Sequence, residues 1–146
     1  MRVSVIGGSS VDAETDELAE ELGERLGERG HDVVCGGLTG VMEAVAAGMA
    51  ETGGRTIGIL PGDDRAAANP HIDVPIATGL GNARNVLVVR NGDAVIAIDG
   101  GYGTLSELAH ALDLDRPVAG IETHDVAGVE AVDSPSAAIE YVESVV

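Results

Sequence analysis

The feature that most constrains the fold is a regular alternation of short apolar runs and longer amphipathic stretches along the whole chain. RVSVI at 2–6 is typical of a buried strand, and in 13–29 the residues Leu18, Leu22 and Leu26 recur at helical spacing. Because strand and helix alternate throughout, we expect a parallel sheet with helices on both faces. The sequence predicts one α/β domain over residues 1–146, doubly wound and Rossmann-like, with six to seven strands. The expected strands are 2–6, 32–35, 55–60, 73–77, 93–98, 117–121 and a short one near 129–132, and the expected helices are about 13–29, 40–51, 81–91, 103–113 and 135–145.

The core of such a domain must be aliphatic, because the chain has two Tyr, no Phe and no Trp. The N-terminal MRVSVIGGSS lacks the regions of a signal peptide, and no apolar run reaches the ~18 residues of a membrane span, so we expect a cytoplasmic protein without a membrane partner. Cys35, the single cysteine, is interpreted as a small core residue. No Cys/His cluster has metal-ligand spacing, and neither a metal nor a cofactor is expected.

The formal net charge is −17, and all eight cationic side chains are Arg. A field of this sign repels phosphodiester backbones, so nucleic acid is not an expected partner. Our hypothesis is that the acidity adapts the protein to a cytoplasm rich in salt, where a Debye length of ~3 Å screens self-repulsion.

Three of the predicted strands end in glycine-rich loops, and each loop leads into a helix. The carboxyl ends of parallel strands meet at one edge of the sheet, where ligands bind at the point of strand-order reversal. Free N–H groups at a helix N-terminus favour an anion, and glycine lets a phosphate approach the backbone. Any one loop could simply be a tight turn, but three at one edge favour a site for a phosphorylated small molecule, most simply a nucleotide. The expected binding residues are Gly7, Gly8, Ser9, Gly36, Gly37, Gly100, Gly101, Gly103 and Thr104.

Standard nucleotide fingerprints are absent. GGSSVDAE after the first strand does not fit G-x-G-x-x-G, and a P-loop requires a Lys that the chain lacks. NAD binding and ATP hydrolysis are therefore not expected. The segment 61–72 is the longest irregular stretch and a candidate lid or binding loop.

Two charged residues are candidates for chemistry, each with a plainer alternative. Thr104 and Glu107 have the T-x-x-E spacing of a capping box, yet Glu107 also lies off the apolar face of its helix and could serve as a general acid or a ribose ligand. Arg84 interrupts the small and apolar stretch 79–89, and its guanidinium suits a phosphate, although it could also be a surface Arg among many acids. His71, in the long loop, could contact a ligand but is interpreted as a solvated loop residue, and His110 and His124 have no partner that the sequence identifies.

Residues 84–107, RNVLVVRNGDAVIAIDGGYGTLSE, resemble the centre of the Lonely Guy (LOG) family of lysine-decarboxylase-like proteins, which is similar in fold to DNA-processing protein A and the molybdenum-cofactor carriers. The family signature is P-G-G-x-G-T-x-x-E with an Arg upstream. Here DGGYGTLSE occupies 99–107, and Arg84 lies fifteen residues before Asp99. GGLTGVMEAVAAG at 36–48 and GGSS at 7–10 are similar to the other two loops of the family.

The resemblance implies a phosphate held by the G-G-x-G-T loop and cleavage of an N-glycosidic bond by Arg84 and Glu107, which releases a free base and ribose 5-phosphate. It also implies a homodimer or larger assembly with the site near the interface. Two positions depart from the family: Asp99 replaces the Pro, and Asn85 replaces a Lys. Two functions therefore stay open, a nucleoside 5′-monophosphate phosphoribohydrolase and a carrier or sensor that binds a nucleotide or phosphorylated pterin. A third, DNA handling, is disfavoured by the charge.

Overall fold

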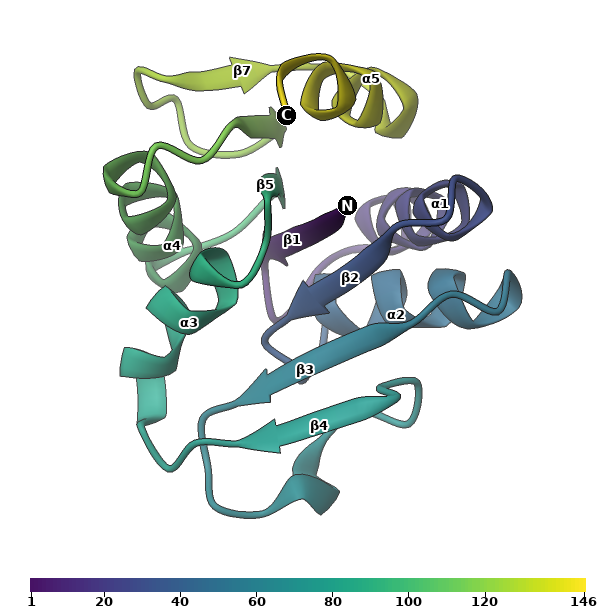
Figure 1. The fold of residues 1–146 in the computed structure, drawn as a ribbon, viewed down its shortest axis with the longest axis vertical. Coiled ribbons are helices and arrows are strands. Elements are labelled where there is room, and N and C mark those ends of the chain that lie inside the picture. The colour runs from purple at the N-terminus through teal and green to yellow at the C-terminus, as the bar shows by residue number, and fades with distance from the viewer.

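The computed structural model describes residues 1–146 and is built around a seven-stranded sheet in the order β4-β3-β2-β1-β5-β6-β7 (Figure 1). Every neighbouring pair of strands is parallel, which confirms the predicted fold class. The strands are β1 (Arg2–Gly7), β2 (Asp32–Cys35), β3 (Thr56–Leu60), β4 (Val74–Ala77), β5 (Ala94–Ile98), β6 (Val118–Ile121) and β7 (Val129–Ala131).

Five α-helices cover the two faces of the sheet. One core of 18 buried residues joins the sheet to α1, α2 and α5, and a second of 11 joins it to α3 and α4. Both are aliphatic, as the composition predicts. The helices are α1 (Ala13–Glu28), α2 (Val41–Glu51), α3 (Asn85–Arg90), α4 (Tyr102–Asp113) and α5 (Pro135–Val145). No helix is both long enough and apolar enough to cross a membrane.

Helices α1 and α2 pack backbone against backbone, because glycines lie at their contact. A Cβ on Gly23 would lie 2.1 Å from the Val45 carbonyl oxygen, and one on Gly48 would lie 2.0 Å from the Glu20 carbonyl oxygen. Only glycine allows so close an approach of the two helices.

The order of the strands reverses beside β1. From β1 the chain adds β2, β3 and β4 on one side and then returns to place β5 on the other, with Val3 opposite both Val33 and Ala94. The loops that follow β1, β2 and β5 are therefore neighbours at the carboxyl edge of the sheet, as the sequence predicts.

The helix predicted over 81–91 is divided in the structure. A 3₁₀ turn, Gly81–Arg84, comes first, and α3 starts at Asn85. Gly79 and Gly81 have φ of +64° and +60°, which no α-helix accommodates. The irregular segment at 61–72 contains another 3₁₀ turn, Arg65–Ala67, which the Asp64 carboxylate caps by accepting from the Ala66 N–H at 2.9 Å.

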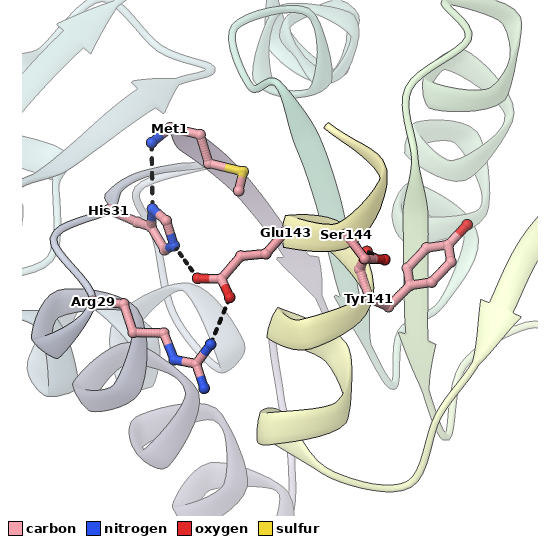
Figure 2. A network of polar contacts seen from close by, with 6 residues as sticks. All are labelled: Met1, Arg29, His31, Tyr141, Glu143 and Ser144. Carbon is pink, nitrogen blue, oxygen red and sulfur yellow. Dashed lines mark hydrogen bonds and ion pairs between the residues drawn. The ribbon is translucent and has the colours of Figure 1, made fainter.

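At the opposite edge of the sheet, polar contacts fasten α5 to the rest of the domain (Figure 2). Glu143 accepts from Arg29 Nη1 at 2.6 Å and from His31 Nε2 at 2.8 Å, and the Met1 amino group donates to His31 Nδ1 at 3.3 Å. The hydrogen bond from His31, with the neighbouring Arg29, lowers the pKa of Glu143. This network ties the C-terminal helix to the ends of α1 and β2, far from the glycine loops.

Candidate functional site

A cavity of about 340 Å³ opens at the carboxyl edge of the sheet, where the loops after β1, β2 and β5 meet. Its floor is the end of β1, and its walls are the β2–α2 loop on one side and the starts of α3 and α4 on the other. Its only charged residues are Arg84 and Glu107. The lining residues are Val5, Ile6, Gly7, Gly8, Ser9, Gly36, Leu38, Met42, Asn82, Arg84, Asn85, Gly101, Tyr102, Gly103, Thr104 and Glu107.

Most of the residues predicted from the glycine loops line this cavity, and two do not. Gly37, with φ of +79°, packs against β3, where a Cβ would lie 2.8 Å from Leu60 Cδ2. Gly100 lies beneath Thr104, whose Oγ1 would be 2.3 Å from a Cβ at that position. Both glycines shape their loops from behind the cavity wall.

Arg84 is buried at the end of the 3₁₀ turn before α3, with 7% of its surface exposed, so its interpretation as a surface Arg is wrong. Its Nε donates to the Ile59 carbonyl at 2.8 Å, its Nη2 donates to the Gly36 carbonyl at 3.4 Å, and its Nη1 donates to Asn85 Oδ1. None of the four ion pairs of the chain includes it. Burial lowers the pKa of Arg84, and the nearby Glu107 partly opposes that shift. The guanidinium is thus a fixed, buried cation without an ion-pair partner.

Glu107 lies one turn into α4, is 8% exposed, and has no hydrogen-bond or ion-pair partner in the chain. Burial raises its pKa from 4.5 to about 7, although the charge of Arg84 pulls in the opposite direction. A carboxyl with this pKa exchanges its proton near neutrality, which is the property of a general acid or base. Glu107 is enclosed by its own chain, so a partner subunit is not needed to explain why it lies off the apolar face.

The capping-box interpretation of Thr104 is wrong. Helix α4 begins at Tyr102, its N-cap is Gly101, and no side chain caps it. Thr104 is therefore inside the first turn, 3% exposed and facing the cavity. The first N–H groups of α4 have no partner within the helix, and the positive end of the helix dipole lies at the same wall as Arg84.

The two departures from the LOG signature have structural consequences. Asp99 has φ of +54°, a conformation that proline cannot adopt, so the family Pro does not fit this loop as it stands. The Asp99 carboxylate lies behind the cavity beside Gly8 and does not line it. Asn85 is buried, accepts from Arg84 and donates from Nδ2 to Ser106 Oγ at 3.3 Å, so it links Arg84 to α4.

Sequence reasoning missed several residues of this site. Thr123 and His124, in the loop between β6 and β7, contact the loop at 99–101. Asn82, Leu38 and Met42 line the cavity without any motif to mark them. No residue of 61–72 lines it, but Asn69 Nδ2 donates to the Leu38 carbonyl at 2.8 Å and so supports the wall from outside. Cys35 is a buried core residue, as expected, and burial raises the pKa of its thiol to about 12.

The parallel sheet and the polar cavity at its point of strand reversal define a Rossmann-like α/β protein, with the cavity where such sheets bind their ligands. Within that class, the chain belongs to the SLOG cluster4 family, which matches residues 1–146. The family relationship inferred from the motif at 84–107 is thereby confirmed.

Two relatives differ in how much they share with this chain. An uncharacterised protein of Archaeoglobus fulgidus is 42% identical over 142 residues, 97% of this chain and 93% of that protein. A cytokinin riboside 5′-monophosphate phosphoribohydrolase of Arabidopsis thaliana is 37% identical over 79 residues, 53% of this chain and 35% of the plant protein. The likeness to the plant enzyme thus covers about half of this chain and a smaller share of the enzyme.

Solved structures match over nearly the whole chain. The molybdenum cofactor binding protein of Rippkaea orientalis has a TM-score of 0.92 at 34% identity, covering 99% of this chain and 96% of that one. The molybdenum cofactor carrier protein of Chlamydomonas reinhardtii has a TM-score of 0.90 at 31% identity, covering 98% and 96%. DNA processing protein A of Helicobacter pylori shares the fold alone, with a TM-score of 0.68 at 19% identity over 99% of this chain and 72% of that one.

Proposed function

We propose that the cavity binds a nucleoside 5′-monophosphate and hydrolyses its N-glycosidic bond to give free base and ribose 5-phosphate. The observation that carries this proposal is a buried Arg without an ion pair and a buried Glu without any partner, which face one cavity beside a helix N-terminus. Unpaired buried charges are costly, and a ligand that supplies an anion and a protonatable leaving group compensates for both.

In this proposal the first turn of α4 and the free N–H groups of Arg84 hold the 5′-phosphate. The backbone N–H groups near Gly101 and Gly103 and the Thr104 hydroxyl are the donors. No carboxylate forms an ion pair with Arg84, so its charge is available to the phosphate. Asn85 and the Ile59 carbonyl fix the plane of the guanidinium.

Glu107 supplies the proton for cleavage. With a pKa of about 7, its carboxyl is partly protonated at neutral pH and donates that proton to the base nitrogen as the bond from nitrogen to C1′ breaks. A water molecule adds to C1′ and returns its proton to Glu107, so that the carboxyl is restored and atoms and charge balance. The identity to the plant phosphoribohydrolase supports this reading.

A carrier that binds a nucleotide or a phosphorylated pterin without turnover is the second candidate. The favouring observation is the full-length likeness, at 31–34% identity, to a molybdenum cofactor binding protein and a carrier protein. The neutral Asn85 at the position of the family Lys also removes one cation from the cavity wall.

The Glu107→Gln variant separates the two candidates. For an enzyme, we expect binding of AMP within about twofold of the wild type and turnover reduced by a factor on the order of 100 or more, because the variant lacks the proton. Glu140→Gln, an exposed change on α5, is the matched control. Binding without base release from the wild type supports the carrier, and loss of both binding and turnover in Glu107→Gln assigns a structural role to the carboxyl.

We infer further that two copies pair through the face of the sheet beside α3. Val74 and Ile76 of β4 are 41% and 42% exposed there, next to an apolar groove of about 310 Å³ that reaches Leu87 and contains no acidic residue. In a chain of net charge −17, an apolar groove without acidic lining residues is where two copies approach with the least repulsion. Sedimentation in molar KCl should show a dimer that Ile76→Glu converts to a monomer. A monomeric wild type, or a dimer that survives Ile76→Glu, contradicts this inference.

A further inference from the structure

The loop between β6 and β7 makes two hydrogen bonds to the glycine loop in front of α4. Thr123 Oγ1 donates to the carbonyl oxygen of Asp99 at 2.7 Å. His124 Nε2 donates to the carbonyl oxygen of Gly101 at 2.9 Å, which also accepts the N–H of Leu105 at 3.1 Å. Both acceptors belong to the short segment that connects β5 to the N-terminus of α4.

No backbone N–H donates to the carbonyl oxygen of Asp99, so Thr123 supplies its hydrogen bond. Asp99 and Gly100 have φ of +54° and +113°, and neither belongs to the sheet or to the helix. If these peptide groups flipped, carbonyl oxygens would replace N–H groups at the cavity wall. A carbonyl oxygen repels a phosphate, whereas an N–H attracts it, so the orientation of these peptides decides whether the wall accepts an anion.

The same arrangement recurs in the loop after β1, which is independent of the first. Thr39 Oγ1 donates to the Ser9 carbonyl at 2.8 Å, and the Val41 N–H donates to the Gly8 carbonyl at 2.9 Å. In both loops, a threonine from the next connection along the edge engages a carbonyl of the glycine loop.

The absence of a side chain at Gly120 leaves room for the Thr123 side chain. A Cβ on Gly120 would lie 2.6 Å from Thr123 Cγ2 and 2.9 Å from Val129 Cγ1. A side chain at residue 120 would therefore push Thr123 away from Asp99. Gly120 has no positive φ that would otherwise call for glycine.

We propose that Thr123 and His124 are positioning residues that hold the Asp99–Gly101 carbonyls away from the ligand, so that the α4 N-terminus selects for a terminal phosphate. This inference rests on the proposed function, since it concerns the affinity of the same site for a phosphate group. The two side chains do not line the cavity and act only through the loop.

The test compares the dissociation constants of AMP and adenosine, measured by titration calorimetry in molar KCl, for Thr123→Val and its parent, both carrying Glu107→Gln so that AMP is not cleaved during the titration. Loss of one hydrogen bond weakens AMP binding roughly fivefold and leaves adenosine binding within about twofold. The double variant Thr123→Val/His124→Ala weakens AMP binding further. Thr123→Ser, which keeps the hydroxyl, binds AMP as tightly as the protein with Thr123. Thr52→Val is the matched control, because Thr52 Oγ1 donates to the Met49 carbonyl at 3.0 Å at the far end of α2 and should change neither constant.

Two outcomes overturn the inference: unchanged AMP binding in the double variant, or equal weakening of AMP and adenosine in Thr123→Val, which indicates general structural damage. Failure of the proposed function is seen separately in the Glu107→Gln parent, as binding of AMP no tighter than that of adenosine.

Discussion

Replacing Glu107 with glutamine removes a carboxyl whose pKa burial raises from 4.5 to about 7. Since the folded protein holds this proton more tightly than the unfolded chain, the contribution of Glu107 to stability is greatest below pH 4.5 and is lost as the pH rises to about 7. At ~1.4 kcal/mol per pH unit, this interval corresponds to about 3 kcal/mol in the free energy of unfolding. Glutamine does not titrate and carries no such dependence.

The assay is urea unfolding of wild type and Glu107→Gln in molar KCl, at pH values from below 4.5 to above 7. The other titrating groups are common to both proteins and cancel in the difference. We expect the free energy of unfolding of the variant, relative to wild type, to rise by about 3 kcal/mol across this range and then to level off. A difference that stays constant with pH would refute the buried, unpartnered carboxyl, and one that falls with pH would mean that Glu107 is ion-paired.

Four further predictions concern separate parts of the molecule. Arg84→Met should weaken AMP binding about tenfold or more by calorimetry. Arg84→Lys should be as weak, because an ammonium cannot both donate to the Ile59 carbonyl, as the guanidinium does through Nε, and contact a phosphate with two N–H groups. Asp99→Pro should lower the melting temperature while Asp99→Gly does not, because glycine accepts φ of +54° and the proline ring fixes φ near −65°; equal effects would contradict this. Gly23→Ala should cost about 1–3 kcal/mol in urea unfolding by overpacking α1 against α2, and an unchanged midpoint would show that the helices can separate freely. The melting temperature should rise with KCl concentration, and full stability in dilute buffer would remove support for adaptation to salt.

The sheet and the meeting of its loops were predictable because both follow from local rules. Alternating apolar runs mark the strands, the helical crossovers between them make them parallel, and the reversal beside β1 brings the glycine loops together. The last helix, from Pro135 to Val145, was predicted with its observed ends, since Ser134 and Pro135 are a clear start signal.

The burial and the hydrogen-bond partners of the site residues were not predictable, because both depend on distant parts of the chain. Arg84 is buried since carbonyl oxygens of β3 and of the β2–α2 loop accept its donors. The T-x-x-E spacing favours a helix that starts at Thr104, but the positive φ of Asp99 and Gly100 turns the chain earlier and places Thr104 inside the first turn. His124 acquires its role from a carbonyl 23 positions away, which no local pattern records.

Cleavage of a nucleoside 5′-monophosphate in the Arg84–Glu107 cavity can be measured by incubating the protein in molar KCl with a panel of nucleoside 5′-monophosphates. Free base and ribose 5-phosphate are both quantified by chromatography. We expect one of them to yield the two products in equal amounts with the wild type, and Glu107→Gln to yield neither. Thermal stabilisation by a member of the panel without any product would contradict the enzyme and leave the carrier as the function of this site.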